Sequence, residues 1–150
     1  MEMRLMRRED VGAVAALERL SFSCPWSENM LAAELDNRYA RYLVAYDDGV
    51  LVGYAGMYLV ADECFICNLA VDPAWRRRGT ARALLEKQIM WARENGAKRV
   101  MLEVRRSNTA AQILYAGFGF FVAGTRPNYY EHPREDALLM NLVFGESTQS

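Results

Sequence analysis

The sequence has few of the residues that usually build metal sites or disulfide frameworks. Its 150 residues include one histidine, His132, and three cysteines, Cys24, Cys64 and Cys67. Three cysteines cannot all pair, and the C-x-x-C spacing of Cys64 and Cys67 lacks the second pair that a structural zinc site needs. We therefore expect no metal, a loop position for His132, and cysteines buried as small apolar residues in a reducing compartment.

An excess of charge of one sign and long apolar runs are also missing. The formal net charge is −1, which gives no overall attraction to nucleic acid or to an anionic membrane. No run approaches the ~20 apolar residues that cross a bilayer, and the first residues lack the apolar region of a signal peptide. We therefore expect a cytoplasmic protein, most simply a monomer, that binds neither nucleic acid nor membrane.

Length and composition indicate one domain. A chain of 150 residues that is 52% hydrophobic can bury one sizeable core. No repeat, low-complexity segment or linker divides it. We expect a single domain over residues 1–150, with a polar tail from 145 to 150 that frays.

The hydrophobic spacing predicts strands and helices in the order β-αα-βββ-α-β-α-ββ. Asp10, Ser27 and Asn108 are expected helix caps, and Gly96 is an expected helix stop. This order predicts a mixed sheet with helices on both faces, in which strand 64–71 and strand 99–104 run parallel. The expected strands are 3–6, 41–47, 50–60, 64–71, 99–104, 120–126 and 137–143, and the expected helices are 11–20, 28–35, 78–95 and 108–116.

A basic turn follows the strand that ends at Val71. It reads Arg76-Arg77-Arg78-Gly79-Thr80-Ala81 and leads directly into the long helix. The first N–H groups of a helix have no partner within it, and the helix dipole adds positive charge there, so this turn is a ready anion site. Gly79 lets the backbone approach an anion without a Cβ between them. The alternative is an exposed loop with solvated arginines.

The pattern Arg76-x-x-Gly79-x-Ala81 resembles the acetyl-coenzyme A turn of the GNAT acetyltransferase superfamily, whose motif is Gln/Arg-x-x-Gly-x-Gly/Ala. Three further stretches strengthen the resemblance: Leu102–Asn108 followed by Leu114-Tyr115, Asn128-Tyr129-Tyr130, and Pro25-Trp26-Ser27. The chain is most similar to the RimI-like branch, which acetylates the N-terminal alanine of the eighteenth small-subunit ribosomal protein. The loop 131–135 is shorter than the corresponding RimI loop, which bears on the identity of the protein substrate.

The resemblance implies a GNAT fold of the α/β (α+β) class, with a mostly antiparallel central sheet of about six to seven strands. It also implies direct transfer from acetyl-coenzyme A to a protein N-terminus, with Glu103 as general base and Tyr115 as general acid. The peptide would lie against Trp26, Tyr129 and Tyr130. The residues implied in cofactor binding are Leu69, Ala70, Val71, Arg77, Arg78, Gly79, Thr80, Ala81, Arg82 and Asn108.

Each of these roles has a structural alternative. Glu103 stands in an otherwise apolar strand, where it could instead pair with Arg99 or Arg105. Tyr115 and the three peptide-site aromatics could be packing residues, as we expect for Trp75 and Trp91. An α-amine, with a pKa of ~7.7–8.0 against ~10.4 for lysine, is the easier amine for one carboxylate to deprotonate.

Two other functions remain open at this point. One is a GNAT enzyme that acetylates a lysine side chain or a small amine. The other is a coenzyme A-binding regulatory module without catalysis. Nucleotide binding is disfavoured, because no Gly-Lys-Ser/Thr follows the basic turn.

Overall fold

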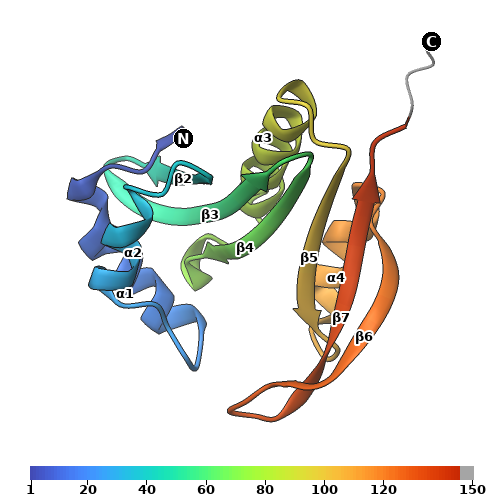
Figure 1. Cartoon of the computed structure of the whole chain (residues 1–150). Helices are drawn as coiled ribbons and strands as arrows, with labels where there is room; N and C mark the ends of the chain where they lie inside the picture. The colour runs from blue at the N-terminus through green and yellow to red at the C-terminus, as the bar shows by residue number, and fades with distance from the viewer. Residues whose placement is uncertain (146–150) are drawn as a thin grey trace.

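The computed structural model describes residues 1–145 and has the expected order of elements (Figure 1). The expected frayed tail falls largely on residues 146–150, which lie outside the described part. Two 3-10 turns, Arg8–Asp10 and Pro73–Trp75, precede α1 and α3. The helices are α1 (Val11–Ser21), α2 (Glu28–Glu34), α3 (Thr80–Glu94) and α4 (Thr109–Gly117). The strands are β1 (Glu2–Leu5), β2 (Ala40–Asp47), β3 (Val50–Val60), β4 (Glu63–Val71), β5 (Arg99–Arg105), β6 (Phe121–Tyr130) and β7 (Glu135–Val143).

The seven strands form one sheet in the order β1-β2-β3-β4-β5-β7-β6. Every neighbouring pair is antiparallel except β4 and β5, whose parallel pairing confirms the crossover predicted from the sequence. That parallel pairing covers only Glu63–Phe65 against Arg99–Met101. Beyond it the two strands diverge (Figure 1), which leaves one edge of β4 without a strand partner.

The helices cover both faces of the sheet, as expected. Val14, Leu17 and Leu31 of α1 and α2 pack with Tyr54 and other side chains on one face. The other face packs against α3 and α4, where Leu85 and Tyr115 join the buried residues of β5 and β7. Close packing within the sheet requires a glycine in β3, because a Cβ on Gly56 would collide with the ring of Tyr42.

The predicted helix stop at Gly96 and the predicted helix caps at Ser27 and Asn108 are confirmed. Asp48 and Gly49 form the β2–β3 turn with positive φ, and Gly96 ends α3 with φ 88°. Ser27 and Asn108 cap α2 and α4 through their side chains.

Asp10 begins α1 but does not cap it with its side chain, contrary to expectation. Its buried carboxylate instead accepts hydrogen bonds from Arg4, from the Tyr46 hydroxyl and from the Arg7 N–H. Burial by itself would raise the pKa of Asp10, but these donors outweigh it and lower the pKa to about 2. A tertiary network has therefore replaced the local cap.

Several element boundaries differ from the sequence prediction, and two of them bear on the functional site. The long helix begins at Thr80 rather than Arg78, because Arg77 and Gly79 have left-handed backbones that a helix cannot include. The strand expected to end at Arg126 continues to Tyr130. Its register shifts between Arg126 and Tyr130, around the left-handed Asn128, whose N–H bonds the Asp136 carboxylate at 2.8 Å.

The cysteine prediction holds for one residue of three. Cys64 is buried, whereas Cys24 and Cys67 are exposed. Cys67 is exposed because the β3–β4 register shifts beside Gly56, leaving Cys67 without a partner on β3. His132 lies in the β6–β7 loop, as expected.

Candidate active site

A cavity of about 320 Å³ opens where β4 ends and α3 begins. Six of the ten residues predicted to bind the cofactor line it: Val71, Arg77, Gly79, Thr80, Ala81 and Arg82. Trp75, which we expected only to pack, also lines the cavity, as do Arg76 and two residues of α4, Ala110 and Leu114. The signal for Leu114 was present in the sequence, because it belongs to the same Leu-Tyr pair as Tyr115.

The basic turn has the backbone of an anion site. Arg77 and Gly79 adopt left-handed conformations, with φ 66° and φ 80°. The first backbone hydrogen bond of α3 runs from the Ala83 N–H to the Gly79 carbonyl at 3.0 Å. In residues 1–145, no backbone acceptor reaches the N–H groups of Thr80, Ala81 and Arg82. These three donors at the positive end of the helix dipole are available to a phosphate.

The structure divides the arginine cluster. Arg76 and Arg77 face the cavity. Arg78 does not line the cavity; its guanidinium lies 5.5 Å from the centre of the Trp75 ring. Arg82 lines the cavity and stacks over Phe118 at 5.3 Å. Three arginines of four are thus placed to attract an anion.

The predicted pantetheine strand has a free edge. Leu69, Ala70 and Val71 pair on one side with β3, opposite Ala55, Tyr54 and Gly53. On the other side β5 has already diverged, so the backbone of residues 69–71 has no strand partner there. A free strand edge beside a cavity can pair with an extended ligand. Asn108 does not line the cavity; its side chain accepts from the Ala111 N–H at 3.1 Å.

Glu103 lies on the face of β5 that points away from α3 and α4. Leu102 and Val104 are buried toward α3 and α4, and Glu103 points to the opposite face with 29% of its side chain exposed. Its carboxylate pairs with the Nε of Arg126 at 2.9 Å. The two partners considered from the sequence are engaged elsewhere, Arg99 with Glu63 and Arg105 with Glu135.

Tyr129 is joined to Glu103 through Arg126, which pairs with Glu103 and lies 5.6 Å from the centre of the Tyr129 ring. The candidate acid, Tyr115, is buried in the core that also holds Leu102 and Val104. Burial raises the pKa of Tyr115 to about 12, and its ring packs 5.8 Å from that of Phe120. Burial, helped by the nearby Glu103, Tyr129 and Tyr115 and opposed by Arg105, raises the pKa of Tyr130 to about 12. Tyr129 and Tyr130 pack edge to face at 5.1 Å. Tyr130 is thus within electrostatic reach of both Glu103 on β5 and Tyr115 on α4.

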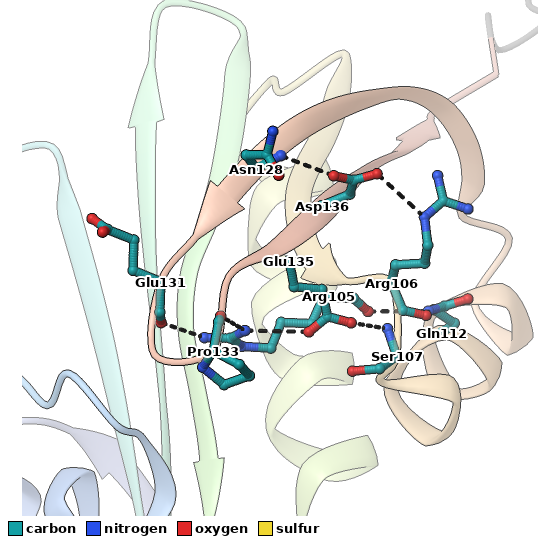
Figure 2. Close-up of polar contacts among 9 residues, drawn as sticks. All are labelled: Arg105, Arg106, Ser107, Gln112, Asn128, Glu131, Pro133, Glu135 and Asp136. Atoms are coloured by element: carbon teal, nitrogen blue, oxygen red, sulfur yellow. Dashed lines mark hydrogen bonds and ion pairs between the residues drawn. The ribbon is translucent and has the colours of Figure 1, made fainter.

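The β6–β7 loop is held by Arg105, a residue whose role the sequence reasoning missed (Figure 2). Its guanidinium donates to the carbonyls of Glu131 at 3.0 Å and Pro133 at 2.9 Å. It also bonds the Glu135 carboxylate at 3.2 Å and stacks over the Tyr130 ring at 4.5 Å.

Glu135 completes this attachment. It accepts from the Ser107 N–H at 2.6 Å, and hydrogen bonding from Ser107 lowers the pKa of Glu135. The loop is therefore tied to the end of β5, two residues from Glu103.

Trp26 lies apart from this cluster. It is half-buried against the core formed by α1 and α2, and no described contact joins it to Glu103 or Tyr129. Its backbone N–H donates to the carboxylate of Glu18 at 2.8 Å.

Two further features concern the described residues as a whole. In residues 1–145 no three histidine, cysteine or acidic side chains gather as metal ligands. The helices of this part are all too short or too polar to cross a membrane.

The geometry matches a known family. The model of the GNAT acetyltransferase family matches residues 11–120. The chain belongs to the GNAT acetyltransferases. The fold and the enzyme class predicted from the sequence are therefore confirmed, and the acetyl donor of this acetyltransferase is acetyl-coenzyme A.

Individual relatives are similar along nearly the whole acetyltransferase chain. A Bacillus subtilis (strain 168) protein with the provisional name ribosomal protein bS18-alanine N-acetyltransferase is 41% identical over 96% of each chain. The Escherichia coli (strain K12) protein named ribosomal protein bS18-alanine N-acetyltransferase is 38% identical, over 89% of this chain and 90% of that one. The crystal structure of the ribosomal-protein-S18-alanine N-acetyltransferase from Escherichia coli superposes with a TM-score of 0.89, at 33% identity, over 99% of this chain and 98% of that one.

Proposed function

We propose that the protein acetylates the N-terminal amine of a protein, and that the substrate is the N-terminal alanine of ribosomal protein bS18. The observation that carries this is the cluster of Glu103, Arg126 and the Tyr129–Tyr130 pair, in which Arg126 pairs with Glu103 at 2.9 Å and lies 5.6 Å from the centre of the Tyr129 ring. The names of the relatives give the same substrate. A ribosomal-protein substrate places the enzyme in the cytoplasm.

The cofactor would occupy the cavity and the adjacent strand edge. Its pyrophosphate would accept from the N–H groups of Thr80, Ala81 and Arg82, with Arg76 and Arg77 nearby. Its pantetheine arm would pair with the backbone of residues 69–71. This placement would direct the thioester toward the side where β5, which carries Glu103, diverges from β4.

The peptide would enter between the β6–β7 loop and the α1–α2 loop. Tyr129 and Tyr130 form one wall, which Arg105 holds in place. Residues 25–27 form the other. This wall contributes backbone and partly buried aromatic surface rather than a group that reaches Glu103.

Transfer then needs three proton movements. Glu103 accepts a proton from the α-ammonium, through water, and later releases it to solvent, and the free amine attacks the thioester carbonyl. The new C–N bond forms, the C–S bond breaks, and the thiolate of coenzyme A takes the hydroxyl proton of Tyr115. The nitrogen, which still carries one proton more than an amide, gives that proton through water to Tyr115, so the tyrosine is neutral again at the end. With a pKa of about 12, Tyr115 holds that proton throughout the neutral range. Arg126 holds the Glu103 carboxylate in place through their ion pair.

A peptide panel tests the proposal. Thiol release from acetyl-coenzyme A is measured with the N-terminal peptide of bS18, with other free N-termini, with N-terminally blocked lysine peptides, and with a polyamine. We expect turnover only on free N-termini, fastest on bS18. Turnover on blocked lysine peptides or on the polyamine would overturn it, as would tight cofactor binding without turnover on any acceptor.

The same assay tests direct transfer. Steady-state patterns should be those of a ternary complex, and Cys67→Ser should retain activity, because no step uses the exposed thiol of Cys67 on β4. Ping-pong patterns together with an isolable acetyl-enzyme would refute direct transfer.

A further inference from the structure

A buried carboxylate joins the α1–α2 loop to the central strands. Glu18 of α1 is 1% exposed. One of its oxygens accepts from the Trp26 N–H at 2.8 Å. The other accepts a short hydrogen bond from the hydroxyl of the fully buried Tyr54, and also receives Nδ2 of Asn68 at 3.4 Å. Every polar neighbour of this carboxylate is a donor, as a buried acidic group requires.

The orientation of Asn68 shows that Glu18 governs the network. Asn68 is 8% exposed and lies on β4 next to Leu69, at the position where the β3–β4 register shifts. Its Nδ2 points to Glu18, and its Oδ1 is the buried side-chain oxygen of residues 1–145 that has no hydrogen-bond partner. The Asn68 amide thus leaves its Oδ1 unsatisfied while its Nδ2 donates to the Glu18 carboxylate. Turning the Asn68 amide over would place Oδ1 against an oxygen of the carboxylate, and both are acceptors.

We propose that Glu18 is a positioning residue that sets the peptide wall at a fixed distance from the acetyl donor. This rests on the proposed function, in which the α1–α2 loop contacts the peptide and residues 69–71 hold the cofactor. Glu18 connects the two through Trp26 on one side and Asn68 on the other. It touches neither reactant in this scheme, so its loss raises the peptide KM without changing cofactor affinity.

The substitution Glu18→Gln tests the connection with almost no change in volume. The glutamine amide carries one acceptor and one donor. If its oxygen keeps the Trp26 N–H, its nitrogen faces Asn68, and Asn68 must turn its amide over to offer Oδ1 as acceptor. The charge-assisted hydrogen bonds to the carboxylate are then replaced by weaker neutral ones, so both connections are loosened. Asn68→Asp in the same chain supplies a charged acceptor to the nitrogen of the introduced glutamine and should restore the strength of the connection.

The matched control is Glu34→Gln. Glu34 lies in α2, in the same layer, and also accepts from a tyrosine hydroxyl, that of Tyr58 at 2.9 Å, and from Asn37 at 3.2 Å. No hydrogen bond joins it to Trp26 or Asn68 within the described residues. It therefore reports the effect of losing a comparable carboxylate without disturbing the connection.

Peptide KM, kcat and the acetyl-coenzyme A dissociation constant are measured for all variants. We expect Glu18→Gln to raise the peptide KM about tenfold, the scale of one lost buried hydrogen bond to a charged group. Glu34→Gln should change it little, and Glu18→Gln/Asn68→Asp should recover most of the loss. An unchanged peptide KM in Glu18→Gln, or an equal rise in Glu34→Gln, would overturn the proposal. So would a matching loss of cofactor affinity.

Amide hydrogen exchange at Trp26 tests, independently of activity, whether Glu18 holds the α1–α2 loop. The Trp26 N–H should be protected in the parent protein, exchange faster in Glu18→Gln and recover protection in the double variant. Equal protection in the parent and Glu18→Gln would refute the anchor. If the parent protein turns over no peptide, the proposed function fails, while this exchange measurement still decides whether Glu18 holds the loop.

Discussion

Gly79 allows the anion-binding role of the basic turn to be separated from its structural role. Gly79 has φ 80°, and an added Cβ would meet no atom within 4 Å. In Gly79→Ala the left-handed backbone should therefore cost about 1 kcal/mol of folding free energy through strain alone. For a chain of this length that corresponds to a fall in Tm of about 2–4 °C.

Gly49 in the β2–β3 turn provides a control for the backbone strain alone. Gly49 also has φ 80° and open space around a built Cβ, but it lies in a hairpin away from the cavity. Gly49→Ala should show the same fall in Tm. Only Gly79→Ala should weaken acetyl-coenzyme A, by about tenfold or more, because the new methyl group stands beside the free N–H groups of Thr80 and Ala81.

Two measurements separate the effect of Gly79→Ala on stability from its effect on cofactor binding. Thermal unfolding without ligand gives the strain, and calorimetric titration with acetyl-coenzyme A gives the dissociation constant of each variant. Equal stability losses combined with unchanged cofactor affinity in Gly79→Ala would refute the assignment of the turn as the pyrophosphate site.

Three further outcomes are expected. Glu103→Gln should lower kcat at neutral pH on the order of a hundredfold with little effect on cofactor binding, and an unchanged pH–rate profile would remove Glu103 from the mechanism. Tyr115→Phe should lower kcat on the order of a hundredfold at constant peptide KM, and full activity would refute its role as acid. Asp10 has a folded pKa of about 2 against a usual 3.8, so it contributes about 2 kcal/mol of stability above pH 4. That contribution is lost as the pH falls toward 2; urea unfolding should show it in the parent but not in Asp10→Asn.

The sequence predicted correctly the features that depend on neighbouring residues, and it failed where residues far apart in the chain interact. The order of elements, the caps at Ser27 and Asn108, and the helix stop at Gly96 depend on residues within a few positions of each other. The predicted strand end at Arg126 was wrong, because the register shift that carries β6 on to Tyr130 depends on pairing with β7. Similarly, Asp10 was expected to cap a helix because its neighbours allow it, but distant Tyr46 and Arg4 bind it instead.

The sequence by itself determined the anion turn, since a strand end, a glycine and a helix start produce aligned N–H groups wherever they occur together. The tertiary structure decided how the catalytic candidates are arranged. Glu103 meets Arg126 from β6 although β7 lies between their strands, and Glu18 meets Asn68 fifty residues away. Such contacts depend on strand order, on register shifts and on the divergence of β4 from β5, which long-range packing fixes and local sequence does not encode.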